Sequence, residues 1–162
     1  MTQKMMSDTH FEIVFVTAAE VLPLRDRVLR ADRPAGASEL RCDRNANTLH
    51  LGAVVGNELV GVGTIAMEDP PGVGIGDAWR LCGMAVLAGW RGQGIGKALA
   101  EKCIDHAKLA TGRIVWCSAR ESAFEFYRRI GFVLVGDLFT RPETIGERYA
   151  RMECHLADEV NH

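Results

Sequence analysis

The most constraining feature of this sequence is a glycine-rich turn between an apolar segment and an amphipathic one. The turn reads Arg91-Gly92-Gln93-Gly94-Ile95-Gly96-Lys97. The apolar segment before it, about Ala78 to Leu87, is a predicted strand, and helical periodicity runs from near Gly94 to before Gly112. Alternate glycines leave backbone N–H groups unshielded, and a helix N-terminus adds about half a positive charge. The turn therefore suits a phosphate or pyrophosphate.

Three other interpretations of the turn can be compared with the residues around it. A flexible turn in which Arg91 and Lys97 are simply solvated remains open, because glycine turns are common. A Walker A loop needs glycine at the position of Arg91 and Ser or Thr at that of Ala98. A dinucleotide fingerprint needs glycine at the position of Leu99. The turn thus fits neither nucleotide motif, and a different phosphate ligand is expected.

The remaining periodicity predicts a mixed α/β (α+β) sheet in the order β-α-β-β-β-α-β-α-β-β, with helices on both faces. Predicted strands are Phe11–Val16, Thr48–Val55, Leu59–Met67, Ala78–Leu87, Ile114–Cys117, Phe132–Phe139 and Tyr149–His155. Predicted helices run from Thr17 to about Arg30, from near Gly94 to before Gly112, and from Glu121 to Ile130. The segment 31–47 is expected to be a long connection or a ragged helix, and 68–77 is expected to be a mobile loop.

Length and composition predict one globular domain, residues 11–156, between a flexible segment 1–10 and a tail 157–162. The net charge of −2 gives no field that would collect nucleic acid or an anionic membrane. Neither a signal sequence nor a long apolar run is evident, so a cytoplasmic protein is expected. The five cysteines and five histidines are scattered, which predicts reduced thiols and no metal site. A homodimer would cover the sheet edges.

Two segments together resemble a known family. The turn, preceded by Leu81-Cys82-Gly83-Met84-Ala85-Val86, resembles the Gln/Arg-x-x-Gly-x-Gly/Ala acetyl-CoA motif of the GNAT superfamily of N-acetyltransferases. The segment Ala123 to Phe132 resembles the second hallmark of that family, a helix with Phe-Tyr followed by Gly-Phe. The resemblance covers the C-terminal half by motif and the N-terminal half only by element order.

The resemblance implies an acetyl-CoA-dependent enzyme that moves an acetyl group by direct transfer to a primary amine of a small molecule or peptide. Two parallel strands, around Met84–Val86 and Ile114–Cys117, would splay apart to admit the pantetheine arm. The implied coenzyme-binding residues are Met84, Ala85, Val86, Arg91, Gly92, Gln93, Gly94, Ile95, Gly96, Lys97, Ser122, Ala123 and Phe126. Arg120 stands where many relatives have Asn, so Ser122 or backbone groups would take over its contact to pantetheine.

Tyr127 is the implied general acid for the departing thiolate, and a core aromatic is the alternative interpretation. A backbone N–H near Ala85 or Val86 would stabilise the oxyanion. The general base stays open between side chains and an ordered water; the candidate side chains are His50, Glu68, Asp69 and Asp77.

In this family the first helix and the connection after it usually form one wall of the acceptor site. Residues there that would touch an acceptor are Arg27, Arg30, Asp32 and Arg41, although the charge pattern of 24–30 is otherwise typical of a solvated helix face. Two alternative functions stay open: a non-catalytic acyl-CoA-binding regulatory module, and an acetyltransferase of protein N-termini or lysines.

Overall fold

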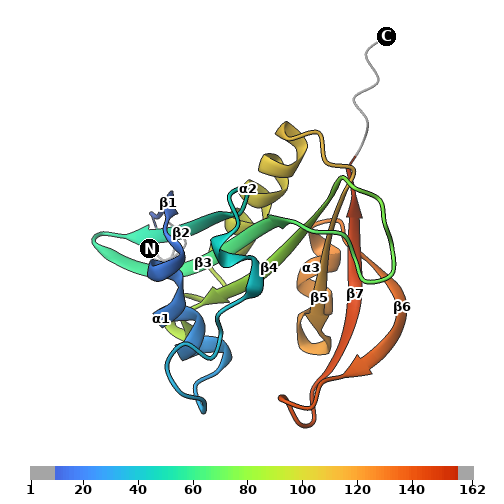
Figure 1. Ribbon diagram of the computed structural model, residues 1–162. Coiled ribbons are helices and arrows are strands. Elements are labelled where there is room, and N and C mark those ends of the chain that lie inside the picture. The colour runs from blue at the N-terminus through green and yellow to red at the C-terminus, as the bar shows by residue number, and fades with distance from the viewer. Residues whose placement is uncertain (1–9, 157–162) are drawn as a thin grey trace, which may run out of the picture.

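The computed structural model describes residues 10–156. The expected terminal segments, 1–10 and 157–162, lie outside the described residues apart from His10. The described chain forms a seven-stranded sheet in the order β1-β2-β3-β4-β5-β7-β6, in which β4 and β5 are the parallel pair (Figure 1). The predicted element order and mixed sheet are therefore confirmed.

The strands are β1 Glu12–Val16, β2 Leu49–Val55, β3 Glu58–Met67, β4 Ala78–Val86, β5 Ile114–Arg120, β6 Val133–Thr140 and β7 Arg148–His155. The α-helices are α1 Ala18–Leu29, α2 Ile95–Leu109 and α3 Phe124–Arg129. Short 3-10 helices lie at Arg41–Arg44, Ala88–Trp90 and Glu121–Ala123. In the described part of the chain, no helix combines the length and the apolar composition needed to cross a membrane.

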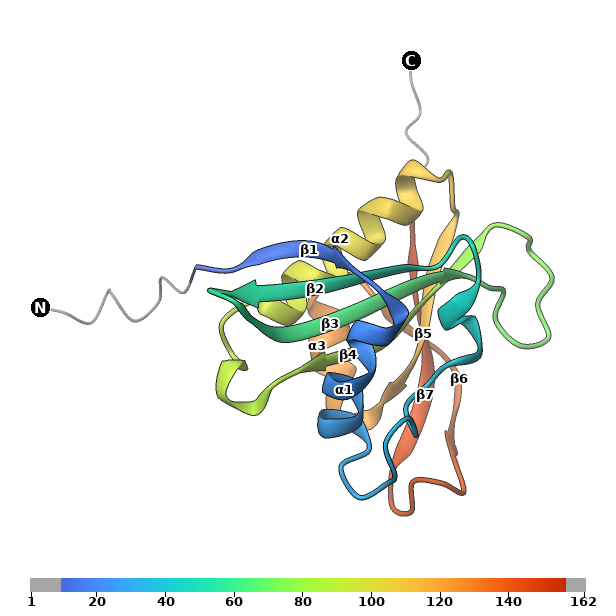
Figure 2. The same ribbon diagram turned by 60° about the vertical axis from the view of Figure 1, so that its left-hand side comes forward.

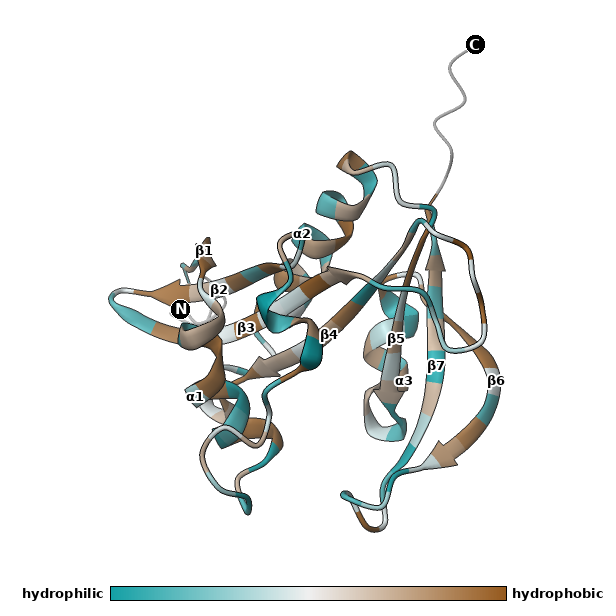
Figure 3. Cartoon of the chain, viewed as in Figure 1, coloured by the Kyte–Doolittle hydropathy of each residue, from teal (hydrophilic) through white to brown (hydrophobic). Residues whose placement is uncertain are grey.

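The helices cover both faces of the sheet, with α1 on one face and α2 and α3 on the other (Figures 1 and 2). A capping box starts α1, because the Thr17 hydroxyl accepts from the Glu20 N–H at 3.2 Å and the Glu20 carboxylate accepts from the Thr17 N–H at 2.8 Å. The stripe of α2 that was expected to be apolar is buried, including Ile95, Leu99 and Cys103 (Figure 3). This burial fixes the start of α2, and with it the glycine turn, against the central strands.

Two segments differ from the sequence-based expectation, and a third, 31–47, combines a long connection with one short helix. β5 extends three residues further, to Arg120, because it pairs with β7 along its whole length. The predicted helix from Glu121 begins as a 3-10 turn and becomes α-helical only at Phe124. The loop 31–47 contains the 3-10 helix Arg41–Arg44, which the Asp43 carboxylate caps by accepting from the Leu40 N–H at 2.8 Å.

Candidate active site

The most distinctive feature of the sheet is a gap between β4 and β5. The two strands pair only from Ala78 to Arg80 on β4 and from Ile114 to Trp116 on β5, although they continue to Val86 and Arg120. Beyond this ladder the strands separate, as expected from the resemblance. Unpaired strand edges offer backbone N–H and C=O groups to an extended ligand. The gap is therefore suited to a linear molecule that carries amide groups.

A β-bulge in β4 bends the strand where the gap opens. Val62 lies opposite Ala85 and Thr64 opposite Cys82, so two residues of β4, Gly83 and Met84, face a single residue of β3. Gly83 has φ of 61°, in the left-handed region that favours glycine. A bulge of this kind bends its strand and increases its twist. The bulge therefore turns β4 away from its parallel neighbour.

A buried ion pair packs directly on this bulge. Arg25 of α1 is fully buried, and its two terminal nitrogens donate to the two oxygens of Asp43 at 2.8 and 2.9 Å. It also donates to the Thr64 hydroxyl at 2.7 Å. Burial would raise the pKa of Asp43, but hydrogen bonds from Arg25 and the Leu40 N–H outweigh it and hold that pKa below its ordinary value. The expectation of a solvated basic face on α1 was thus wrong at Arg25, because tertiary contact with Asp43 compensates its charge.

The glycine turn has the geometry of an anion site. Gly92 and Gly94 both have left-handed backbones, with φ of 78° and 84°, and open space surrounds the position of a side chain at either. The first helical bond of α2 runs from the Ala98 N–H to the Gly94 carbonyl at 3.0 Å, so the N–H groups before it have no carbonyl partner inside the helix. Uncovered amides at a helix start fit a phosphate group.

The turn is tied to its surroundings at two points. The Arg91 Nε donates to the Val86 carbonyl at 3.2 Å, which joins the turn to the end of β4. A Cβ at Gly96 would lie 3.4 Å from the Phe126 ring, so glycine here lets α3 pack closely against the start of α2. These contacts bring both sequence motifs together beside the gap.

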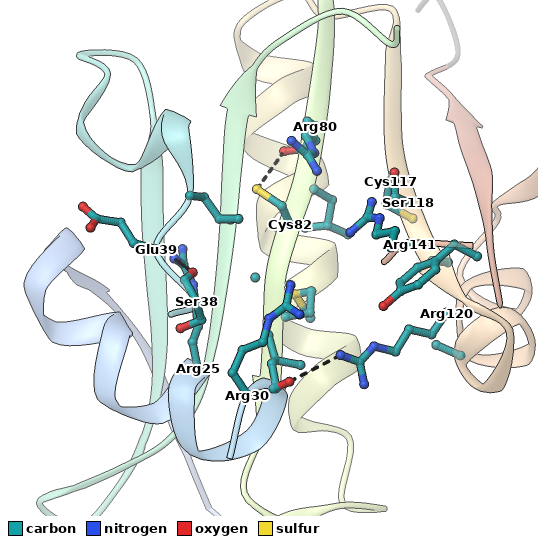
Figure 4. A pocket seen from close by; sticks show the side chains of 18 of the residues that line it. Arg25, Arg30, Ser38, Glu39, Arg80, Cys82, Cys117, Ser118, Arg120 and Arg141 are labelled. Atoms are coloured by element: carbon teal, nitrogen blue, oxygen red, sulfur yellow. Dashed lines mark hydrogen bonds between the residues drawn. The ribbon is translucent and has the colours of Figure 1, made fainter. Parts of the chain in front are cut away.

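A cavity of about 250 Å³ lies on the α1 side of the gap, between α1, β4, β5 and the segment after β6 (Figure 4). Of the residues predicted to bind coenzyme or to catalyse, Met84, Ala123 and Tyr127 line it. The other predicted residues lie outside its wall: Ala85 is buried in the core, Val86 and Phe126 lie next to Gly96, Ser122 belongs to the 3-10 turn before α3, and the remainder form the glycine turn.

Tyr127 combines a buried ring with a hydroxyl that has no hydrogen-bond partner among residues 10–156. Its ring makes edge contacts with Phe126 and Phe132, with centroids 5.0 and 5.3 Å apart. Within residues 10–156 its hydroxyl makes no hydrogen bond, and the residue lines the cavity. Burial raises the pKa of this phenol well above its ordinary value. Tyr127 therefore stays protonated at neutral pH, and its hydroxyl can donate a hydrogen bond into the cavity.

The four side chains considered as general base lie elsewhere. His50 is buried and bonds Thr64 and the Asp43 carbonyl. Glu68 pairs with Arg80, Asp69 accepts from the Gly76 N–H, and Asp77 pairs with Arg113. Glu39 is the carboxylate among the described residues that line the cavity, and Figure 4 shows it directed away from the arginines. Its nearest ion-pair partner is Arg44 at 3.5 Å.

Arginines from separate elements extend into the same space (Figure 4). Arg30 ends α1, Arg80 lies on β4, Arg120 ends β5 and Arg141 follows β6, and all four line the cavity. Of the residues near α1 that the sequence suggested for acceptor binding, only Arg30 is in this wall. No sequence pattern joins four arginines so far apart, because chain folding alone brings them together.

Neither metal ligands nor disulfides mark the site. Within the described part of the chain, no cluster of three His, Cys, Asp or Glu side chains could hold a metal ion. All five cysteines are free, with Cys42 and Cys82 sulfurs 3.9 Å apart beside the cavity. Burial raises the pKa of Cys117 to about 12, so this thiol is a poor nucleophile at neutral pH.

Comparison with known proteins gives consistent results. The model of the acetyltransferase (GNAT) family matches residues 18–132. The uncharacterized N-acetyltransferase YitI of Bacillus subtilis is 27% identical over 132 residues, covering 81% of this chain and 88% of that protein. An acyl-CoA N-acyltransferase from Pseudomonas aeruginosa aligns with a TM-score of 0.70 at 21% identity, covering 90% of this chain and 99% of that one. An aminoglycoside 6'-N-acetyltransferase complexed with coenzyme A aligns with a TM-score of 0.71 at 16% identity, covering 93% and 99%.

Proposed function

Because this chain belongs to the acetyltransferase (GNAT) family, we propose that it transfers the acetyl group of acetyl-CoA to a primary amine of a small molecule or peptide. One observation supports this most strongly. The gap between β4 and β5 lies between the glycine turn and Tyr127, so a phosphate site, an extended channel and a proton donor are adjacent. This set matches the three parts of an acyl-CoA: its pyrophosphate, its amide-containing arm and its thiolate leaving group.

In the proposed complex, acetyl-CoA supplies the activated acetyl thioester. Backbone amides of Gly92, Gly94 and the first turn of α2 bind the pyrophosphate, with Arg91 and Lys97 adding positive charge. The free edges of β4 and β5 bind the pantetheine arm as an added strand would be bound. The remaining proposed contacts come from Met84, Ala85, Gln93, Ser122, Ala123 and Phe126.

The oxyanion donor is proposed to be the Val86 N–H. The Leu87 N–H donates to the Val60 carbonyl on β3 at 2.9 Å. Because successive peptide groups of a strand point to opposite edges, the Val86 N–H points away from β3 and toward the gap. A fixed amide there would stabilise the negative charge that develops on the thioester oxygen during attack.

The proton transfers are divided between Tyr127 and water. The protonated Tyr127 hydroxyl, which makes no hydrogen bond with the described residues, donates to the departing thiolate. A bound water removes the ammonium proton of the acceptor, since the four candidate side chains lie outside the cavity wall and the Glu39 carboxylate points away. Direct transfer is favoured over an acyl-enzyme because the raised pKa of Cys117 keeps that thiol protonated.

The experiment that tests this proposal combines acetyl-CoA with a panel of amino acids, polyamines, aminoglycosides and peptides. Mass spectrometry would detect N-acetylated product, and calorimetry would measure coenzyme A binding. Gly94→Val should abolish binding, whereas Gly146→Val is a matched control with a similar φ of 86° and open surroundings. Unchanged coenzyme A affinity in Gly94→Val would contradict the site, and binding without product from any acceptor would favour the non-catalytic alternative.

The domain organisation, the cellular compartment and the oligomeric state of the enzyme are also proposed. Residues 11–156 act as one catalytic domain, and the free cysteines suit the reducing cytoplasm. The edge strand β6 exposes apolar side chains, including Leu138 at 42% and Phe139 at 38%. A second copy of the chain would cover this edge. Sedimentation of the parent and of Leu138→Glu tests the dimer, which the variant should weaken.

A further inference from the structure

The cavity beside Tyr127 is unusually positive. Of the residues that the structure describes, five arginines and one glutamate line it, although the whole chain has a net charge of −2. Two of the arginines are compensated, since Arg25 pairs with Asp43 at 2.8 Å and Arg80 with Glu68 at 3.3 Å. The positive charge of the wall is therefore carried by the other three, Arg30, Arg120 and Arg141.

None of these three arginines has a carboxylate partner within residues 10–156. Arg120 donates to the Leu29 carbonyl at 3.4 Å, and Arg141 stacks with its guanidinium carbon 4.4 Å from the centre of the Tyr149 ring. The guanidinium of Arg30 makes neither an ion pair nor a hydrogen bond with the described residues. Each guanidinium therefore keeps most of its N–H donors for a ligand.

The local electrostatics favour an anion in the cavity. Burial lowers the pKa of Arg141, and the positive charges of Arg80 and Arg30 act in the same direction, while Tyr149 and Glu143 act in the opposite one. Like charges held together at a partly enclosed wall repel, and a bound anion relieves this repulsion. Guanidinium groups pair with carboxylate or phosphate through two parallel hydrogen bonds, which adds directional preference to the charge.

This anion site is separate from the proposed phosphate site of the coenzyme. The arginines belong to the wall on the α1 side of the sheet, whereas the glycine turn leads into α2 on the opposite side (Figures 2 and 4). Tyr127 lines the same cavity as the arginines. A molecule held there by its anionic group would thus present another group to the point where the acetyl is transferred.

Resting on the proposed function, we propose that the acceptor is a small amine that also carries a carboxylate or phosphate, and that Arg30, Arg120 and Arg141 bind this anionic group. The cavity of about 250 Å³ is smaller than the sites of drug-sized ligands, which start near about 300 Å³. A zwitterion of amino-acid size fits this volume and charge. Polyamines and aminoglycosides carry several positive charges and would be repelled.

The first arm of the test compares acceptors that differ only in the anion. Amino acids are compared with their amides, and O-phosphoethanolamine with ethanolamine, while spermidine and an aminoglycoside serve as polycations. The anionic acceptor of each pair should have a kcat/KM about 10-fold or more above that of its neutral counterpart, as expected for hydrogen bonds to a charged group. The preference should fall as salt is raised. Whichever pair shows the preference identifies carboxylate or phosphate as the anion.

The second arm uses Arg30→Gln and Arg141→Gln, with Arg113→Gln as the matched control. Arg113 is exposed, pairs with Asp77 and lies outside the cavity wall. Each cavity variant should raise the KM of the anionic acceptor by about 10-fold or more and leave its neutral counterpart unchanged. The KM of acetyl-CoA should stay near the parent value. Thermal unfolding of each variant verifies that the fold is intact.

The outcomes separate this inference from the proposed function. Acetylation of neutral or cationic amines with equal or higher kcat/KM would overturn the inference and leave the acetyltransferase activity standing. If the cavity variants raised only the KM of acetyl-CoA, the arginines would be assigned to coenzyme binding. That result would overturn the inference as well. Failure to bind coenzyme A or to acetylate any amine would overturn both.

Discussion

Replacing Gly83 by alanine is the sharpest test of how the gap is built. Gly83 has φ of 61°, and a Cβ added there would lie 2.5 Å from Nε and 2.9 Å from Cζ of Arg25. The guanidinium cannot retreat freely, because both oxygens of Asp43 and the hydroxyl of Thr64 hold it. Gly83→Ala must therefore strain the backbone and also displace a buried ion pair.

The two contributions have different sizes. A left-handed alanine costs about 1–2 kcal/mol, and breaking a buried ion pair costs about 3–5 kcal/mol. The free energy of unfolding should thus fall by about 4–7 kcal/mol, a large part of the usual total of about 5–15 kcal/mol. For a chain of this length the melting temperature should fall by about 8–28 °C.

Gly56→Ala is the matched control. Gly56 has nearly the same φ, 62°, but nothing lies within 4 Å of an added Cβ. It should therefore show only the backbone cost, about 1 kcal/mol after the unfolded chain loses some freedom. Urea unfolding followed by circular dichroism measures both variants. If Gly83→Ala were no less stable than Gly56→Ala, Arg25 would not constrain the bulge and this account of the gap would be wrong.

Two further predictions concern Tyr127 and Asp43. Tyr127→Phe should lower kcat by about 100-fold or more, the usual effect of losing a general acid, with little change in coenzyme A affinity or thermal stability. A variant with nearly parental kcat would show that Tyr127 only packs in the core. Asp43→Asn should reduce the free energy of unfolding at pH 7 by about 3–5 kcal/mol, because it leaves Arg25 buried without a counter-charge. Since the pKa of Asp43 is lowered in the folded state, its contribution is present above the unfolded value of about 3.9 and is lost as pH falls through the folded value. Urea unfolding from pH 7 to 3 should show the two proteins converging, and a constant difference would contradict the assigned pKa.

Much of the architecture followed from local sequence. Thr17 and Glu20 marked the start of α1 because a capping box needs only two side chains at a fixed spacing. The buried stripe of α2 was visible as apolar periodicity, and Gly92 and Gly94 occupy the left-handed positions that make the turn. These features depend on residues a few positions apart, and such patterns are recorded directly in the sequence.

The bulge and the charged wall of the cavity depended on tertiary structure. In the sequence Gly83 resembles any other strand glycine, whereas in the structure Arg25, 58 positions earlier, packs against it. Arg25 itself looked like a solvated helix residue, because its partner Asp43 lies in a loop without periodicity. Arg30, Arg120 and Arg141 belong to different elements and share one cavity only after the sheet has formed. Local sequence thus determined the elements and the glycine turn, whereas long-range packing decided which charges are buried and which side chains line the cavity, because both depend on side chains distant in sequence.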